Sequence, residues 1–231
     1  MNEIIRKRKS IRKYDHTKLD NTTLDHVRAQ FDKVKPLYPD IKYSIEIADK
    51  AKRAFGINAP HYLVLRSEKK DGMYENIGFI GQQLDLYFSA NELGSCWVGT
   101  AKPEDDSKDS LHYVICISFG KSAEPLHRNV SDFRRKPLES ISKGNDLRLE
   151  SARLAPSGIN AQGWYFIAEE GQIHCYCKKP TPLLGKLIGG LANIDLGIAL
   201  YHIASESDKF GFVKKEDVPY VKGYIYTGTV I

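Results

Sequence analysis

The most constraining feature of this chain is an order of helix and strand patterns that recurs in its two halves. The first half has helical spacing of apolar residues at 45–55, a short buried strand at 62–65, a long helix at about 74–93 and an interior strand at 113–119. The second half has a helix at about 146–154, strands at 164–168 and 172–177, a glycine-rich helix at about 182–205 and a strand at about 223–230. These alternating elements predict an α+β fold with helices packed around mixed or antiparallel sheets.

Shorter segments complete this pattern. Residues 2–8 are expected to form a short helix, and another helix is expected to begin near Asp20 or Asn21, where capping residues precede apolar positions. The long first-half helix is expected to end at Gly94. Pro103–Ser110, which is rich in acidic residues and serines, is predicted to be an exposed loop.

Repeated motifs favour an internal duplication. Two of them recur in the same order: Gly-Ile-Asn-Ala at 56–59 and 158–161, and Leu-Asp-Leu or Ile-Asp-Leu at 84–86 and 194–196. A chance match of four residues is not rare in a chain of 231 residues, so the shared order of elements carries more weight. We predict one compact unit of two pseudo-symmetric halves, at about 1–123 and 124–231. The alternative is a single mixed domain in which ordinary alternation of helices and strands imitates a repeat.

Composition narrows the class of protein. Hydrophobic residues make up 42% of the chain and charged residues 27%, which is ordinary for a globular domain. The net charge of +5 does not by itself imply nucleic acid, and it also suits a phosphate-bearing ligand. The most apolar long stretch, Leu183–Tyr201, contains Lys186, Asp195 and four glycines, which argues against a membrane span. With no secretory signal visible and four cysteines that form no dense framework, we expect a reduced, cytoplasmic protein.

The first candidate binding segment lies near the N-terminus. In an extended Arg8–Lys9–Ser10–Ile11–Arg12 segment, the side chains of Arg8, Ser10 and Arg12 lie on the same side of the backbone. Two guanidiniums and a hydroxyl suit a phosphate with an attached polyol, because arginine forms bidentate charge-assisted hydrogen bonds. The alternatives are a solvated basic N-terminus and a nucleic-acid patch, although aromatic residues do not alternate with the charges.

The second candidate segment is Arg153–Trp164. Pro156 ends the preceding helix, and Ser157, Asn160 and Gln162 then offer donors and acceptors in a tight turn. Gly158 permits a close backbone approach, so this turn could hold the polar edge of a flat heteroaromatic ligand. The alternative is an ordinary connection between a helix and a strand.

Further segments are less specific. In Gly94–Gly99, two bracketing glycines would present backbone amides to a ligand, and Cys96 has no evident base to make it a nucleophile. The basic cluster Asp132–Leu138 lies where the halves join and could add phosphate-binding charge or be a solvated linker. His174–Cys177 is better explained as a β-hairpin strand than as a zinc site. The chain has no Walker lysine motif, no GxGxxG fingerprint and no GxSxG elbow.

Taken in order, these segments resemble the FMN-dependent nitroreductase family, in particular its branch in which one chain mimics the dimer of ordinary members. Arg8-x-Ser10-x-Arg12 matches the family's opening segment, which in relatives holds the FMN phosphate, the ribityl chain and the N1/O2 edge. Pro156-Ser157-x-x-Asn160-x-Gln162-x-Trp164 matches the segment that in relatives reaches the flavin from the partner subunit. Gly94–Gly99 resembles the stretch whose amides approach N5 and O4, and Arg134–Pro137 resembles the late basic segment that returns to the phosphate.

The resemblance implies one cofactor site, with the flavin rather than a side chain or a metal carrying the chemistry. The site residues that it implies are Arg8, Lys9, Ser10, Arg12, Cys96, Trp97, Val98, Gly99, Arg134, Arg135, Pro156, Ser157, Gly158, Asn160 and Gln162. Only one site is expected, because the first-half stretch 55–61 lacks the Pro-Ser and the Gln, and the second half lacks an Arg-x-Ser-x-Arg opening. Gly163 stands where relatives usually have proline.

The function implied by the resemblance is that of an FMN-dependent oxidoreductase. NAD(P)H would pass a hydride to FMN N5, and the flavin would pass it in a ping-pong cycle to a small flat acceptor such as a nitroaromatic or a quinone. A monomer that mimics the family dimer is expected, and further association remains open. The alternatives are an FMN-binding protein without turnover and, less favoured, a nucleic-acid-binding protein.

Overall fold

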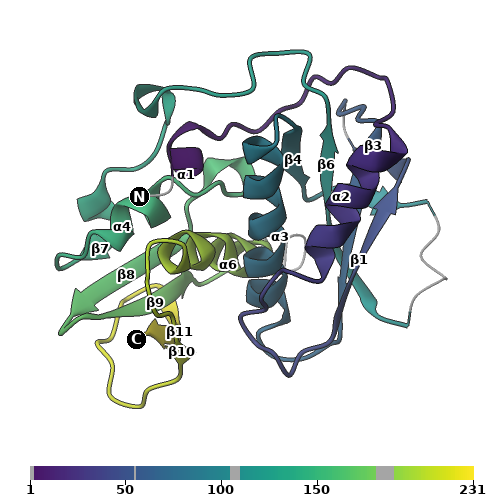
Figure 1. The fold of residues 1–231 in the computed structure, drawn as a ribbon. Coiled ribbons are helices and arrows are strands. Elements are labelled where there is room, and N and C mark those ends of the chain that lie inside the picture. The colour runs from purple at the N-terminus through teal and green to yellow at the C-terminus, as the bar shows by residue number, and fades with distance from the viewer. Residues whose placement is uncertain (1–2, 55, 105–109, 181–189) are drawn as a thin grey trace.

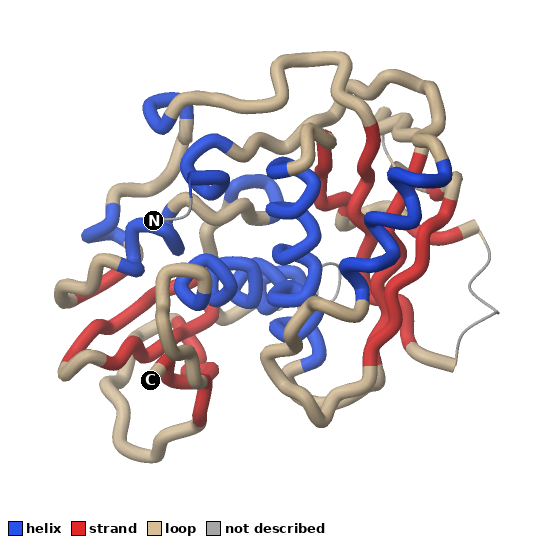
Figure 2. Tube along the Cα trace, viewed as in Figure 1, coloured by secondary structure: helices blue, strands red, loops and turns tan. Residues whose placement is uncertain are grey.

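The computed structural model describes residues 3–54, 56–104, 110–180 and 190–231, and it forms two β-sheets with a pair of long helices at the centre (Figure 1). The helices are α1 (Glu3–Lys7), α2 (Asn21–Phe31), α3 (Met73–Ala90), α4 (Arg148–Arg153) and α6 (Leu191–Ala204), with 3-10 turns η1 (Val130–Asp132), η2 (Leu138–Ser140) and η3 (Gly158–Asn160). Helix α3 packs on one sheet and α6 on the other (Figure 2).

The sheets are mostly antiparallel. The first has the order β1 (Tyr43–Ala48), β3 (His61–Ser67), β6 (His112–Gly120), β4 (Gly94–Val98). The second has the order β10 (Phe212–Val213), β11 (Tyr224–Val230), β9 (Gln172–Lys178), β8 (Trp164–Glu169), β7 (Ser142–Lys143), and β7 runs parallel to β8. A small ribbon pairs β2 (Ala51–Lys52) with β5 (Lys102–Pro103). The predicted α+β class is confirmed.

Most predicted elements are confirmed, with small changes at their ends. Asp20 caps α2, because its carboxylate accepts a hydrogen bond of 2.8 Å from the Thr23 N–H. Helix α3 ends at Ala90 rather than at Gly94, which is instead the first residue of β4. The predicted second-half helix is described from Leu191 onward, because residues 181–189 lie outside the described residues. In the predicted loop Pro103–Ser110, Pro103 belongs to β5, and residues 105–109 lie outside the described residues.

The predicted helix at 45–55 is wrong. This segment forms β1 and then β2, with Phe55 outside the described residues. Ile45 and Ile47 alternate along β1 and pair with Leu65 and Leu63 of the fully buried strand β3. The period-two placement of these β-branched residues against a buried partner strand outweighs the apolar spacing of three and four residues.

Helices α3 and α6 cross at two glycines. A Cβ atom on Gly78 would overlap the carbonyl oxygen of Ile194, and a Cβ atom on Gly197 would overlap the carbonyl oxygen of Glu75. Each glycine therefore packs against a carbonyl group of the other helix, three residues before the glycine of that helix. The two contacts are equivalent, as they would be around a two-fold axis. Only residues without a side chain allow the two backbones to approach this closely.

The strand order of the first sheet recurs in the second. The order β1-β3-β6-β4 across the first sheet corresponds to the order β8-β9-β11-β10 across the second. A long helix follows β3 along the chain, and another follows β9. Before the first strand of each set, Tyr38 donates its backbone N–H to Asn76 at 2.9 Å, and Gly158 donates its own to Asp195 at 2.9 Å. Asn76 and Asp195 each lie two residues before a crossing glycine.

This recurrence corrects the register of the repeat. The tetrapeptide at 56–59 lies between β1 and β3, whereas the one at 158–161 precedes β8, so the two are not in equivalent places. Asp85 lies in the second half of α3 and Asp195 in the first two turns of α6. The first-half counterpart of the turn at 156–162 is therefore 36–42, not 55–61. A common origin of the halves stays a prediction.

Adding one methyl group at the helix crossing should destabilise the fold. We expect Gly78→Ala and Gly197→Ala each to lower the free energy of unfolding by about 1–3 kcal/mol, because a rigid backbone carbonyl occupies the space. Gly163→Ala is the control, since its Cβ would lie 3.7 Å from the nearest atom. Urea denaturation measures the change, and unchanged midpoints for both helix variants would contradict the close crossing.

Candidate functional site

A cavity between the two halves gathers residues from three of the predicted segments. Its volume is about 110 Å³. Its lining includes these predicted residues: Ser10, Arg12, Cys96, Trp97, Gly99, Pro156, Ser157 and Gly158. The arm at 8–12 is held against β4 by a bridge between Ser10 and Ser95 and by the Ile11 N–H, which donates to the Ser95 carbonyl at 2.8 Å. The first and second halves thus face each other across one space.

The turn on the second-half side of the cavity is strained. Ile159, Asn160 and Gln162 have φ angles of 48°, 58° and 47°, in the left-handed region that non-glycine residues rarely adopt. The side chain of Ile159 lines the cavity yet is 97% exposed. Strain of this kind clusters at ligand-binding segments. The cavity is also smaller than the roughly 300–1,000 Å³ of typical ligand pockets, so a ring system requires this turn to move outward.

Asn160 and Gln162 connect this turn to the basic segment at the join of the halves. Asn160 Oδ1 accepts from Arg135 Nη1 at 2.6 Å, and its Nδ2 donates to the Arg134 carbonyl at 2.7 Å. Gln162 Oε1 accepts from the Lys136 backbone N–H at 2.7 Å. The structure therefore brings the Pro-Ser-x-x-Asn turn and the late basic segment together. Direct flavin contact by either amide stays a prediction.

Three arginines lie close together behind the arm. Arg8 is 1% exposed, its Nη2 donates to Ser10 Oγ at 3.2 Å, and Arg128 Nε donates to the Arg8 carbonyl at 3.0 Å. Burial, together with the neighbouring guanidiniums, lowers the pKa of Arg128 and of Arg135. Arg8 Nη1 and Arg135 Nε are buried and make no hydrogen bond within the described part of the chain. Buried donors without acceptors, on clustered cations, are the donor set that an anionic phosphate satisfies.

Seven of the predicted residues do not line this cavity. Four of them, Arg8, Arg135, Asn160 and Gln162, make the contacts described above, and the other three have different surroundings. Lys9 Nζ pairs with Glu124 at 3.4 Å and donates to the Pro125 carbonyl. Val98 is buried among the apolar side chains of the first sheet. Arg134 is exposed and contributes its carbonyl group. Arg128, which the sequence pattern missed, has no regular spacing from the other basic residues that could have identified it.

A buried polar network fixes the arm and β4. Asp85 lies 2.9 Å from Arg8 Nε and accepts from Ser95 Oγ at 2.7 Å and from Gln82 Nε2 at 3.1 Å. Gln82 Oε1 accepts from the indole N–H of Trp97 at 3.2 Å, so one amide links a cavity wall to the arginine cluster. Gln82 Nε2 also lies 3.1 Å from His202 Nε2. Burial lowers the pKa of His202 to about 3, and the neutral ring accepts this hydrogen bond.

Asp195 provides a second buried carboxyl group at the site, and the sequence did not identify it as a site residue. It lines the cavity at 7% exposure, and its two oxygens lie 2.9 and 3.1 Å from the Gly158 backbone nitrogen, whose N–H they share. Burial raises the pKa of Asp195 to about 7, because the charged form loses its hydration. A single acidic residue in a very apolar helix was the available signal.

The cysteines carry no nucleophilic chemistry in this arrangement. All four are free and buried, and burial raises the pKa of Cys96, which keeps its thiol protonated. Cys175 and Cys177 lie on β9, which pairs with β8 as the predicted hairpin. Within the described ranges, no group of three His, Cys, Asp or Glu residues could hold a metal ion. No helix in these same ranges is long and apolar enough to cross a membrane.

Comparison with known families agrees with this geometry. The family described as "Putative TM nitroreductase" matches residues 1–207. The chain belongs to this nitroreductase family. Membership of this family indicates that the chain is an oxidoreductase. No curated protein sequence matches the chain.

One solved structure shows the same fold over nearly the whole chain, and others match part of it. A putative nitroreductase from Thermotoga maritima superposes with a TM-score of 0.66, over 99% of this chain and 90% of that chain, at 21% identity. An FMN-dependent nitroreductase from Clostridium difficile R20291 has a TM-score of 0.46, over 58% of this chain and 95% of that one, at 22% identity. A putative NADH oxidase from Clostridium acetobutylicum has a TM-score of 0.46, over 60% of this chain and 96% of that one, at 17% identity.

The raised pKa of Asp195 predicts a pH-dependent stability. The unfolded carboxyl loses its proton near pH 4 and the folded one near pH 7, so the folded chain binds more protons between these values and loses stability as the pH rises through this window. Asp195→Asn keeps an acceptor for the Gly158 N–H but removes the titrating group, so the variant does not lose stability as the pH rises. We expect the variant to gain stability over the wild type, by on the order of a few kcal/mol, between pH 5 and pH 8.

Thermal unfolding of both proteins across this pH range provides the measurement. Asp217→Asn, a change at an exposed loop position, is the matched control. A difference between Asp195→Asn and the wild type that stays constant from pH 5 to pH 8 would show that this carboxyl is ionised in the folded chain.

Proposed function

We propose that this nitroreductase-family chain is an FMN-dependent NAD(P)H oxidoreductase that reduces small flat acceptors such as nitroaromatics or quinones. The observation that carries the proposal is the pair of buried, unpartnered guanidinium donors on Arg8 and Arg135, next to a cavity lined by the predicted flavin segments. A phosphate group is the natural acceptor for such donors.

The residues present fit FMN in both of its parts. Arg8, Arg128 and Arg135 would hold the phosphate, with Ser10 and Arg12 following along the arm toward the ring. The ring would lie among the apolar cavity residues Trp97, Ile115, Leu191, Ile194 and Ile198, which exclude water. FMN, when bound, supplies the transfer of a hydride from a nicotinamide to a second substrate.

The side chains of this chain then set the environment of the ring. Arg12 lines the cavity and would place a permanent positive charge there, which favours negative charge on a bound ring. Asp195, whose pKa burial raises to about 7, would hold an exchangeable proton at the cavity wall. The Gly158 N–H fixes the orientation of this carboxyl group.

In the first half, aromatic rings occupy the position that corresponds to the ring-binding part of this cavity. Tyr38 stands where the second half has Gly158, and its ring packs edge-on against Phe212 at 6.0 Å. Phe79 stacks on Phe210 at 5.6 Å in the same region. A Cβ on Gly158 would meet only Asp195 oxygens, at 3.8 Å and beyond, so the space there is open. This asymmetry favours one flavin site for each chain, and it supports a monomer, since one chain supplies both cavity walls.

The direct test is the visible spectrum of the purified full-length chain. We expect yellow protein, or protein that becomes yellow on addition of FMN, with absorbance near roughly 450 nm that anaerobic NADPH or NADH bleaches. Restored absorbance on addition of a quinone would complete the cycle. An FMN-binding protein without turnover, which the small cavity favours as the second candidate, would stay yellow with both nicotinamides. A chain that takes up no FMN would contradict both candidates.

A variant of the arginine cluster ties this test to the observation that supports it. Arg135→Ala should weaken FMN binding by about 10- to 100-fold, because a buried charge-assisted contact to phosphate is lost. Riboflavin, which lacks the phosphate, should bind the variant and the wild type equally. Arg28→Ala, on the exposed face of α2, is the matched control. Equal FMN affinity of Arg135→Ala and the wild type would remove this cluster from the site.

A further inference from the structure

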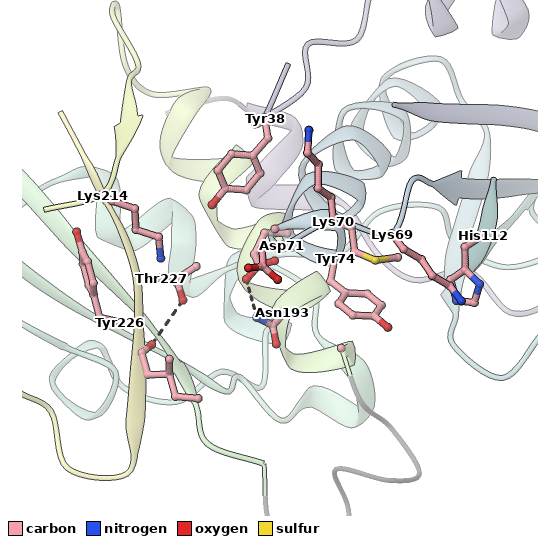
Figure 3. A pocket seen from close by; sticks show the side chains of 15 residues that line it. Tyr38, Lys69, Lys70, Asp71, Tyr74, His112, Asn193, Lys214, Tyr226 and Thr227 are labelled. Atoms are coloured by element: carbon pink, nitrogen blue, oxygen red, sulfur yellow. Dashed lines mark hydrogen bonds between the residues drawn. The ribbon is translucent and has the colours of Figure 1, made fainter. Parts of the chain in front are cut away.

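A second, larger cavity lies beside the first turn of α6. Its volume is about 740 Å³, within the range typical of ligand pockets (Figure 3). Gly190 and Asn193 line it, whereas Leu191 and Ile194 line the candidate flavin cavity, so the two cavities flank adjacent faces of one helical turn. The two cavities are therefore separated by the side chains of this one turn.

The second cavity is built from counterparts of the elements that build the first. The candidate flavin cavity uses the turn before β8, the start of α6 and the strand β6. The second cavity uses Tyr38 from the turn before β1, the start of α3 and the strand β11. Because Tyr38 and Phe212 fill the position that corresponds to the flavin ring, the open space lies next to that position, toward α6 and the loop at 69–72.

The chemistry of the walls points to a nucleotide. Glu75 is 5% exposed yet lines the cavity, and within the described residues its carboxylate accepts one hydrogen bond, from Asn193 Nδ2 at 2.5 Å. A buried carboxylate of this kind suits the amino edge of a base. The rings of Tyr38, Tyr74 and Tyr226 surround the same space and offer flat apolar surfaces to that base (Figure 3).

Two lysines add the charge that a phosphate needs. Lys214 extends into the cavity over the Tyr226 ring, with its Nζ 5.3 Å from the ring centre (Figure 3). Lys69 lies on the far rim beside His112, and the neighbouring Lys70 is occupied by Asp40 at 3.0 Å. An acceptor of amino protons and flat rings match the base of a nucleoside phosphate, and the ammonium groups match its phosphate.

We infer that this cavity binds the adenosine diphosphate half of the nicotinamide dinucleotide whose other half enters the candidate flavin cavity. This inference rests on the proposed function, because only a dinucleotide that reduces the flavin needs to reach both spaces. It assigns Glu75 to the base and Lys214 and Lys69 to the phosphates. These residues bind and orient the electron donor and take no part in hydride transfer.

The experiment uses ADP as the probe, with the full chain loaded with FMN. Calorimetric titration should show one ADP site, which Lys214→Ala and Glu75→Gln each weaken by about tenfold. Glu75→Gln keeps an acceptor for Asn193, and Lys214 is exposed, so both variants are expected to fold. Lys222→Ala, an exposed lysine outside the cavity, is the matched control and should bind ADP as the wild type does.

Steady-state kinetics give a second readout of the same variants. The KM for the nicotinamide dinucleotide should rise by about tenfold in Lys214→Ala and Glu75→Gln, while kcat and FMN affinity stay unchanged. Absence of ADP binding to the wild type, or equal ADP affinity in both variants and the wild type, would overturn the inference. The two proposals fail separately. A chain that binds no FMN, or whose FMN is not bleached, contradicts the proposed function, and ADP titration of the full chain without FMN still decides the cavity.

Discussion

The contact on which the arrangement depends is the crossing of α3 and α6 at Gly78 and Gly197. At this point the two helix backbones are in contact. The two sheets, and the turns before β1 and β8, pack around this helix pair. The same approach lets Asp195 reach the turn at Gly158 and lets Asn76 reach the turn at Tyr38. Both cavities lie at the ends of this helix pair, so their shape depends on how closely the helices approach.

A buried charge balance explains why the site is polar on one side only. Asp85 neutralises one guanidinium charge, while Arg8, Arg128 and Arg135 carry three, and Asp132 also acts on Arg128. Arg8 is buried and the other two arginines are partly buried, so the remaining positive charge is costly unless an anion completes it. The cavity itself, by contrast, is lined mainly by apolar residues, with Ser10, Arg12, Ser157 and Asp195 as its polar side chains. Phosphate and ring are thus separated by the chemistry of the walls.

Much of the fold can be predicted from the sequence, because the apolar residues of the long helices and buried strands follow a strong periodicity. The segment at 45–55 was misassigned because its apolar residues fit two periods, and only pairing with β3 decides between them. The predicted repeat aligns the two tetrapeptides, whereas the recurring strand order and hydrogen bonds align Tyr38 with Gly158, which share no residue type. Structure alone could show this, through hydrogen bonds that recur while side chains differ.

The candidate site was predictable to the extent that short motifs carry it. Ser10, Arg12 and Ser157 line one cavity, and their contact with a flavin stays a prediction. Arg128 and Asp195 could not be found this way, because their importance comes from burial and from neighbours far away in the sequence. Lys9 was included only through its place between two arginines, and the structure directs it to Glu124 instead.

We propose that the two halves complete one flavin site and that Tyr38, Phe79, Phe210 and Phe212 occupy the corresponding position in the first half. The number of FMN molecules bound to each chain at saturation tests this directly, from the absorbance of FMN released by denaturation and the protein concentration. We expect a ratio of one. A ratio of two would show that both pseudo-symmetric positions are open, and a ratio of zero would show that the chain binds no flavin.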